Sequence, residues 1–327
     1  MARTHAALMR SRSLRDKIIE RLGGEIPTTI WVSDYSEDGG TIELQGKTAY
    51  QIANEGMAKK VLDGTMSPFA DKDAFRIGFS NIRGSGRLSV FPYNICKKAV
   101  LFYSEKGEIV LDPCAGHNSR MQTTWELGRG YIGYDVAHCF MEFNRGVADR
   151  IQKADSEQFF KRGGPCLVLH EQSSEHMEEA DNSVHFVFTS PPYWALEHYD
   201  DNPAQLGWKD GKPRPYGDFL DGIERMAKEC FRVLKPGRLC AININDFMVD
   251  GKFYMYHADL AERFMRAGFL MYDVIIIAWS STPFATIFAE RSMKTRRCGK
   301  AHEFLLIFKK PGDLDIPYNR DALLAGK

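Results

Sequence analysis

The sequence predicts an α/β protein built on a doubly wound, mostly parallel sheet of seven strands. From about residue 108 onward, short apolar runs alternate with longer stretches of helical periodicity, which is typical of a parallel sheet covered by helices on both faces. A hydrophobic fraction of 44% over 327 residues can fill the core of one large domain. No apolar run reaches the roughly 20 residues of a membrane-spanning helix, and no secretory signal follows the basic start. We therefore expect a soluble, intracellular protein with no membrane partner.

The expected strands are short runs of apolar and β-branched residues. In chain order they are Ile109–Asp112, Tyr131–Asp135, Cys166–His170, Val184–Thr189, Arg238–Ile244, Met271–Trp279 and Glu303–Phe308. The segment between the last two is too irregular for a helical crossover, so we expect them to form an antiparallel hairpin at the sheet edge. Residues 1–90 are less periodic and are expected to form an N-terminal accessory region beside a main domain of residues 91–327.

Two helices are expected in the second half of the chain. Apolar residues recur at helical spacing from Phe219 to Phe231 and again from Leu260 to Met265. Gly268 is placed to end the second helix, because glycine adopts the left-handed backbone of a helix C-terminus without strain. We assign these apolar residues to core packing.

Charge and cysteine content exclude several classes of protein. The chain carries 43 basic and 43 acidic residues, which is unlike a protein that coats nucleic acid non-specifically. Its seven cysteines are scattered and never form a Cys-x-x-Cys pair, so neither a disulfide framework nor a zinc site is indicated. We expect reduced thiols and no metal.

The sharpest chemical signal follows the fourth expected strand and reads Ser190-Pro191-Pro192-Tyr193-Trp194. Ligands of open α/β sheets bind at the carboxyl ends of the strands. A Pro-Pro pair can simply end a strand, but two prolines also hold the chain extended and fix the directions of the preceding carbonyl groups. The serine before the prolines and the two aromatic residues after them favour a functional turn.

Such a turn suits the methylation of a base amine. The lone pair of that nitrogen is delocalised into the ring, so acceptors must draw the two N–H bonds out of the ring plane. The Ser190 hydroxyl and the Pro191 carbonyl can be these acceptors. A base that leaves the duplex also needs an aromatic surface in place of its lost stacking. Tyr193 can supply that surface, with Trp194 shaping the pocket wall, and no general base of high pKa is needed.

A second signal lies at the end of the first expected strand. Asp112 there opens a turn of small residues, and Asp135 ends the next strand about 20 residues later, where a carboxylate can accept hydrogen bonds from the ribose of a nucleoside. The turn has one glycine, Gly116, whereas a dinucleotide site needs several. S-adenosylmethionine has no phosphate, so the sequence favours it as the cofactor.

Together these segments resemble the DNA amino-methyltransferases, the family that makes N4-methylcytosine or N6-methyladenine. The family signatures are a polar residue before Pro-Pro-Tyr, matched by Ser190 to Tyr193, and an Asp-Pro-Phe-Ala-Gly-Ser-Gly loop, matched in part by Asp112 to Gly116. Gln205-Leu206-Gly207, residues 232–237 and residues 302–309 are also similar to the family. The resemblance covers roughly residues 90 to 310 and implies a Rossmann-like methyltransferase domain.

The resemblance also implies which residues bind the cofactor and where the protein works. The implied set lies ahead of the first strand, in the loop after it and at the ends of the next two strands: Phe91, Pro92, Asn94, Asp112, Pro113, Cys114, Gly116, His117, Asn118, Ser119, Asp135, Glu171 and Gln172. Glu171 and Gln172 are alternatives for the adenine contact. Gly116-His117-Asn118 departs from Gly-Ser-Gly, and Asn118 tolerates a left-handed backbone. The location implied is the cytoplasm of a bacterial or phage-infected cell.

Double-stranded DNA is the partner that this family implies. Serine before Pro-Pro leans toward cytosine N4, and aspartate or asparagine toward adenine N6. Little chain is left for a C-terminal recognition domain, so we expect DNA contacts from residues 280–301, basic at Arg291, Lys294, Arg296 and Arg297, and from part of residues 1–90. A solvated loop surface would explain the same basic residues. The recognition sequence, a restriction partner and the oligomeric state, a dimer included, stay open.

Three other functions compete with this interpretation. A cytosine C5 methyltransferase needs a Pro-Cys nucleophile after the fourth strand, and the chain has none there. A methyltransferase of the same fold could act on RNA, protein glutamine or a small molecule, because a planar amide poses the same lone-pair problem. A DNA-binding relative without catalysis is suggested by the altered Gly116-His117-Asn118 turn, although it would not need an intact Ser-Pro-Pro-Tyr turn.

Overall fold

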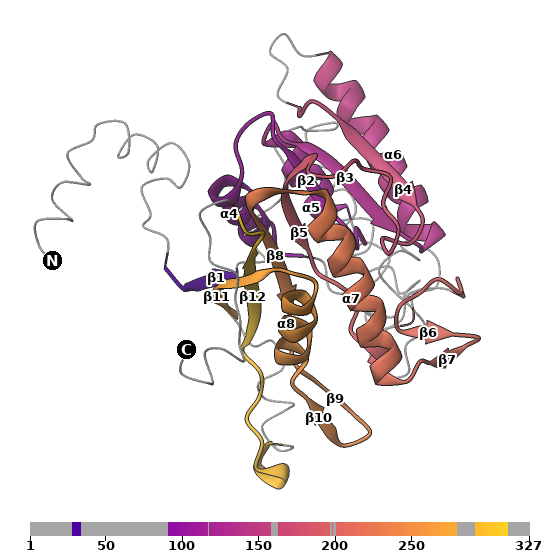
Figure 1. Cartoon of the computed structure of the whole chain (residues 1–327), viewed down its shortest axis with the longest axis vertical. Coiled ribbons are helices and arrows are strands. Elements are labelled where there is room, and N and C mark those ends of the chain that lie inside the picture. The colour runs from indigo at the N-terminus through magenta and orange to yellow at the C-terminus, as the bar shows by residue number, and fades with distance from the viewer. Residues whose placement is uncertain are drawn as a thin grey trace, which may run out of the picture.

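A computed structural model of the 327-residue chain describes residues 28–33, 91–116, 118–157, 163–196, 198, 201–279 and 292–312. Its centre is an eight-stranded sheet of order β1-β11-β12-β8-β5-β2-β3-β4 (Figure 1). The strands are β1 (Ile30–Ser33), β2 (Ile109–Asp112), β3 (Gly130–Asp135), β4 (Leu167–Glu171), β5 (Val184–Thr189), β8 (Leu234–Ile244), β11 (Leu270–Trp279) and β12 (His302–Lys309). β12 pairs antiparallel with both of its neighbours, β8 and β11, and all other neighbouring strands pair in parallel.

The sheet confirms the α/β fold and corrects its edge. All seven expected strands are present, and β11 and β12 pair antiparallel as predicted. The hairpin is not at the edge, however, because β12 lies between β8 and β11, and β1 then pairs in parallel with β11. Four residues of the region expected to be accessory, Ile30–Ser33, therefore complete the main sheet.

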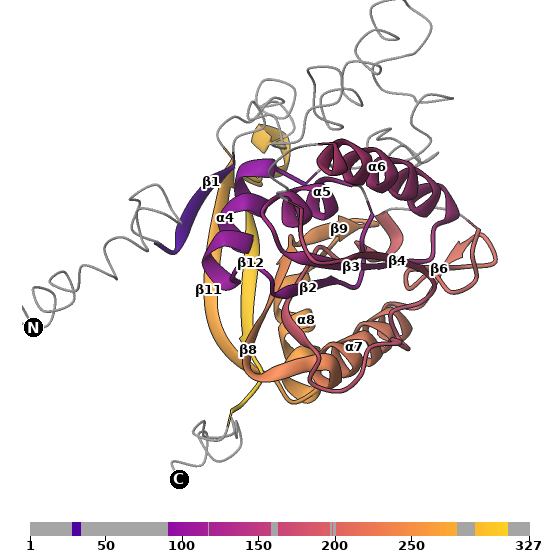
Figure 2. The same cartoon turned by 90° about the horizontal axis from the view of Figure 1, so that it is seen from above.

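Helices cover both faces of the sheet (Figure 2). One face carries α4 (Tyr93–Tyr103), α5 (Ser119–Glu126) and α6 (His138–Ser156), and the other carries α7 (Tyr216–Val233) and α8 (Tyr256–Arg266). Alternate residues of each strand feed these two layers, as in β5, where Phe186 packs in the α4 layer and Val187 in the α7 layer. The expected helices are thus confirmed, and Gly268 follows α8 with a φ of 112°.

Two small hairpins, neither of them expected from the sequence, project from this framework. One comprises β6 (Trp208–Lys209) and β7 (Lys212–Pro213), and the other β9 (Phe247–Val249) and β10 (Lys252–Tyr254). Each turns through an Asp-Gly pair, Asp210-Gly211 and Asp250-Gly251, with positive φ at both residues. That geometry fits the twist of adjoining strands and makes Asp-Gly a strong hairpin signal, so these two pairs could have predicted both turns.

The described residues contain no helix long and apolar enough to cross a membrane. Within the same ranges, no group of three or more His, Cys, Asp or Glu side chains is arranged to hold a metal ion.

Candidate active site

Asp112 is the centre of a buried hydrogen-bond network at the carboxyl end of β2. Its side chain is fully buried and accepts hydrogen bonds from Arg120 Nε (2.7 Å), Tyr131 Oη (2.9 Å) and Thr189 Oγ1 (2.6 Å). The amide of Cys114 lies 3.3 Å from Asp112 Oδ1 and 3.2 Å from Thr189 Oγ1. Asp112 thus joins the loop after β2 to the end of β5, one residue before Ser190, and lies beneath the cleft instead of in its lining.

Arg120, which is not among the residues predicted for the site, supports the same loop from inside the protein. Its guanidinium donates to the carbonyl oxygens of Cys114 (2.6 Å) and Ala115 (3.2 Å) as well as to Asp112, and lies over the Phe91 ring. Burial alone would lower the pKa of Arg120, but the adjacent Asp112 carboxylate raises it above its ordinary value. The loop conformation therefore depends on a charged pair in the core.

Asp135, at the end of β3, closes the loop from the other side. Its carboxylate accepts the amide of Gly116 through Oδ2 (2.8 Å) and that of Ala137 through Oδ1 (2.9 Å). Gly116 has a φ of 48°, so glycine occupies the left-handed position of this turn. Asn144 of α6 donates to the Gly116 carbonyl at 2.8 Å and adds a contact that the sequence did not suggest.

The residues after Gly116 turn into α5. Asn118 has right-handed dihedrals, φ −58° and ψ −15°, so the expected left-handed role falls to Gly116 instead. Asn118 and Ser119 are both buried. His117 lies outside the described residues.

An open cleft of about 640 Å³, including the solvent at its mouth, lies over the carboxyl ends of β2, β3 and β5. The lining includes residues from four chain segments that the sequence predicted: Pro113, Cys114, Gly116, Asp135, Gln172, Ser190 and Pro192. Val136, Phe140, Ser173, Ser174 and residues 204–207 complete it. The loop after β2 and the Ser-Pro-Pro turn thus share one cavity.

Of the two alternatives after β4, the structure places Gln172 in the cleft. Glu171 faces α6, where it pairs with Arg145 and His138 at 2.7 Å each. These hydrogen bonds, from Arg145 first and His138 second, hold the pKa of Glu171 below its ordinary value. Glu171 therefore fastens β4 to α6 and does not line the cleft.

The segment ahead of β2 also lies outside the cleft lining. Phe91 is buried against Phe188, with ring centroids 5.3 Å apart, and Pro92 is buried beside it. Asn94 Nδ2 donates to the carbonyl of Val32 in β1 at 2.8 Å. In the described structure these residues connect α4 to the sheet, because their side chains turn toward the core and β1.

The Ser190–Trp194 turn follows β5 as predicted. Pro191 is buried, Ser190 and Tyr193 are partly exposed, and the Pro192 carbonyl accepts a hydrogen bond from Tyr256 Oη at 3.1 Å. This hydrogen bond attaches the turn to the first residue of α8. Tyr193 packs edge-on against Tyr256 and Phe247.

Trp194 does not form the expected pocket wall. It is 9% exposed, packs on Tyr216 and Tyr254, and has an unusual positive φ of 48°. Its carbonyl oxygen would lie 2.4 Å from a Cβ atom at position 207, so Gly207 permits this close approach. Trp194 therefore packs the turn against the aromatic side chains of Tyr216 and Tyr254, outside the cleft lining.

Three of the four expected DNA-contacting residues lie in or just after the short helix of residues 292–295. Lys294, Arg296 and Arg297 are exposed, and Arg291 lies outside the described residues. Arg297 contacts Met248 of β9, so this basic segment adjoins the β9–β10 hairpin.

The sheet, with its single antiparallel strand between β8 and β11, and the cleft over β2 and β3 match the Rossmann-like fold of methyltransferases. Cys114, although it lines the cleft, is no candidate nucleophile, because burial raises the pKa of its thiol well above the ordinary value.

Comparison with known proteins relates part of the chain to one family. Residues 184–324 match the family model described as DNA methylase. The chain is 28% identical over 176 residues to the Type II beta methyltransferase M.BslI of Bacillus sp. (strain NEB-606), covering 47% of this chain and 17% of that protein. It is 29% identical over 161 residues to the Type II methyltransferase M.MthZI of Methanothermobacter thermautotrophicus, covering 44% of each. Residues 184–324 thus match the DNA amino-methyltransferases, a family whose cofactor is S-adenosyl-L-methionine.

The chain spans less than half the length of these curated relatives. A solved structure described as a DNA modification methylase of Thermus thermophilus, in complex with S-adenosyl-L-methionine, is 28% identical with a TM-score of 0.29. That match covers 45% of this chain and 53% of the solved one.

Proposed function

We propose that this protein transfers a methyl group from S-adenosyl-L-methionine to an exocyclic amino group of a base in DNA, with cytosine N4 favoured over adenine N6. One observation carries the proposal. Ser190 and Pro192 line the same cleft as Pro113, Gly116 and Asp135, so a nucleoside held by the loop and a base held by the turn would meet in one cavity.

The lining of the cleft fits the cofactor. A carboxylate at the end of β3, an amide at Gln172 and the ring of Phe140 are groups that recognise a ribose, an adenine amine and an adenine face. Asp135 and Gln172 would hold the nucleoside, and the Pro113–Gly116 loop would border the methionine end. The bound cofactor supplies an activated methyl group.

The protein's own part of the reaction is to prepare the amine. The Ser190 hydroxyl and the Pro191 carbonyl would accept its two hydrogen bonds, which localises the nitrogen lone pair toward the methyl group. Pro191 is buried and the next carbonyl is held by Tyr256, so these acceptors do not have to be ordered when the base arrives. Tyr193 would lie against the base, and the proton leaves from a strongly acidic methylated ammonium.

A labelling assay tests the proposal. Mixed-sequence duplex DNA, transfer RNA and a glutamine peptide are each incubated with the protein and labelled S-adenosyl-L-methionine, and digested nucleosides are identified by mass spectrometry. We expect label in N4-methylcytosine of the DNA. Label in N6-methyladenine would refute the preference for cytosine but leave DNA as the substrate. Label only in RNA or peptide would refute DNA as the substrate. Cofactor binding without transfer to any of them would favour a non-catalytic role.

Asp135→Ala is expected to weaken cofactor binding first. A hydrogen bond to a charged group contributes about 1.5–3 kcal/mol, so the Kd for S-adenosyl-L-methionine should rise roughly 10- to 150-fold. Asp135→Asn keeps one acceptor for the Gly116 and Ala137 amides and should show a smaller rise. Isothermal titration measures both. A loss of kcat at saturating cofactor as large as the loss of affinity would contradict this role.

The basic segment after residue 291 is proposed to bind DNA phosphates. Removing the charges of Lys294, Arg296 and Arg297 together should flatten the dependence of log Kd on log salt, by about 0.9 for each phosphate that is no longer neutralised. The matched control removes three exposed charges elsewhere, at Lys106, Arg150 and Lys153. Fluorescence anisotropy with a labelled duplex gives both slopes, and equal slopes for the two triple variants would show that this segment is only a solvated surface.

A further inference from the structure

The β9–β10 hairpin is built directly onto the back of the Ser190–Trp194 turn. Its first residue, Phe247, packs against Tyr193 with ring centroids 6.4 Å apart, and its last, Tyr254, packs against Trp194 at 5.1 Å. The two inner rings also stack on each other at 5.5 Å. The base of the hairpin is therefore part of the aromatic support of the turn, and its position relative to Ser190 is fixed.

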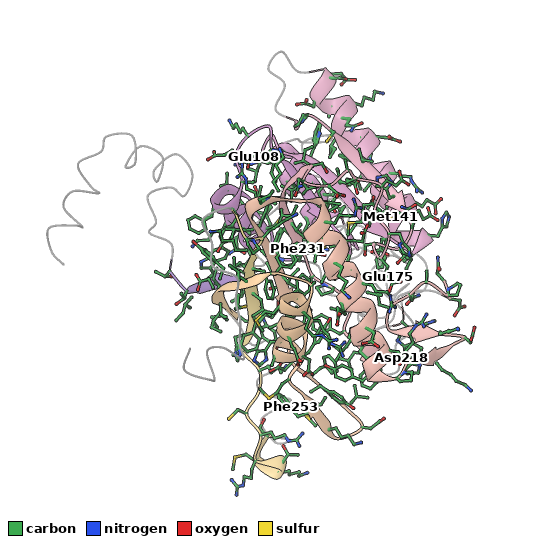
Figure 3. The ribbon with its side chains drawn as sticks, viewed as in Figure 1. Glu108, Met141, Glu175, Asp218, Phe231 and Phe253 are labelled. Carbon is green, nitrogen blue, oxygen red and sulfur yellow. The ribbon has the colours of Figure 1, made fainter. Side chains whose placement is uncertain are left out.

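The outer side of the same hairpin carries a half-exposed aromatic side chain. Strand residues alternate in direction, so Tyr254 points inward and Phe253 points outward, where it is 55% exposed. Met255, which lies between β10 and α8, is 53% exposed. Figure 3 labels Phe253 on the hairpin, at the end of the molecule where the short helix of residues 292–295 also lies. Two large exposed apolar groups beside a substrate site indicate a contact surface.

Basic side chains lie on and beside the hairpin. Lys300 donates to Asn245 Oδ1 at 2.9 Å, and its ammonium lies 5.9 Å from the centre of the Phe253 ring. Arg297 contacts Met248 on β9, and Lys252 begins β10, while Asp250 in the turn is the acidic residue of the hairpin. An exposed aromatic ring with cations beside it suits contact with a DNA strand, because a base can stack on the ring while the cations pair with phosphates.

We infer that the β9–β10 hairpin enters the DNA duplex beside the target base and that Phe253 takes the place of this base in the stack. The inference rests on the proposed function and extends it to how the duplex is opened. A base must leave the duplex to reach a pocket, and apolar side chains inserted between base steps offset the lost stacking. Phe253 has the required exposure, and its hairpin is anchored on the turn that would receive the extruded base.

The experiment compares two DNA substrates at the methylated site found by the labelling assay. In one duplex the target base is paired, and in the other an abasic site lies opposite it, so the base is already unpaired. Phe253→Ala should lower kcat/KM on the paired duplex by roughly 10- to 100-fold, the range expected for losing one aromatic–base stack. The loss should shrink to within about threefold on the unpaired duplex, and Phe253→Trp should restore activity on the paired one.

The protein contains a matched control at the opposite end of the sheet. Tyr272, near the start of β11, is 60% exposed and has the Lys309 ammonium 5.9 Å from its ring centre, the same arrangement as Phe253 with Lys300. Tyr272→Ala should leave kcat/KM unchanged on both duplexes. Thermal unfolding of all variants should give the wild-type Tm, because these side chains are exposed.

Several results would overturn the inference. An equal loss on both duplexes would mean that Phe253 only supports the turn, and no loss on either would mean that it does not meet the DNA. If the wild-type protein methylates no DNA at all, the proposed function fails separately, and binding of a mixed-sequence duplex then decides the hairpin. Equal Kd values for wild type and Phe253→Ala in that assay would refute the contact.

Discussion

Ser190→Ala is expected to remove most methyl transfer while leaving cofactor affinity unchanged. The hydroxyl is one of two acceptors that would hold the target amine, and removing one preorganised polar group from such a site lowers kcat by about 10²–10³. Ser190 lines the cleft at the turn, whereas the loop and Asp135, which would border the cofactor, are held together through other atoms. Single-turnover rates with duplex DNA, together with the Kd for S-adenosyl-L-methionine, separate these effects.

Ser173→Ala is the control for this change. Ser173 also lines the cleft, but its hydroxyl accepts from the amide of Glu175 at 3.2 Å and so caps a local turn. Its loss should change kcat little. If Ser190→Ala and Ser173→Ala lose activity equally, or if Ser190→Ala loses cofactor affinity in proportion to rate, Ser190 is not an acceptor for the target amine.

Asp112→Asn is expected to destabilise the whole domain. The change leaves the buried Arg120 guanidinium without its counter-charge, and breaking a buried pair in this way costs about 3–5 kcal/mol. Three donors, on Arg120, Tyr131 and Thr189, would lose a charged acceptor at once. Urea unfolding measures the free energy of unfolding, and the expected loss is a large fraction of the stability of a typical domain.

Glu171→Gln provides the comparison, since Glu171 also ends a parallel strand but pairs with Arg145 and His138 near the surface. Surface ion pairs contribute about 0–1 kcal/mol, so this variant should unfold almost as the wild type does. Normal stability of Asp112→Asn together with weak cofactor binding would instead make Asp112 a direct cofactor ligand, as the family resemblance implied.

The parallel strands were predictable because each is a compact apolar run. Ile109–Asp112 and Val184–Thr189 match β2 and β5 residue for residue. The predicted start of β8, at Arg238 instead of Leu234, is too late, because Lys235-Pro236-Gly237 is typical of a break between a helix and a strand. In the structure Pro236 and Gly237 lie within β8, where the pairing with β5 shifts register between Val184 and Phe186.

Elements that depend on distant partners were not predictable in the same way. β1 has four residues and pairs Ile30 with Ile276, so its sequence shows no periodicity long enough to mark it. Within the candidate site, the sequence predicted roles for Ser190, Gly116 and Asp135 from their place at or after strand ends, and the structure brings all three to one cleft. The sequence could not point to Arg120 or Asn144, because nothing local distinguishes a buried polar residue on a helix from an exposed one.

β1 has a consequence for how the chain can be divided. A protein shortened to begin at Phe91 would keep every residue that lines the cleft, but the outer side of β11 would lose the backbone partners that Ile30–Ser33 provide. Unpaired strand edges invite pairing with other chains. The carbonyl that receives Asn94 would disappear as well, and with it one tie between α4 and the sheet. The part of the fold that the structure describes is therefore discontinuous in sequence, because residues 91–312 take one strand of their sheet from before them.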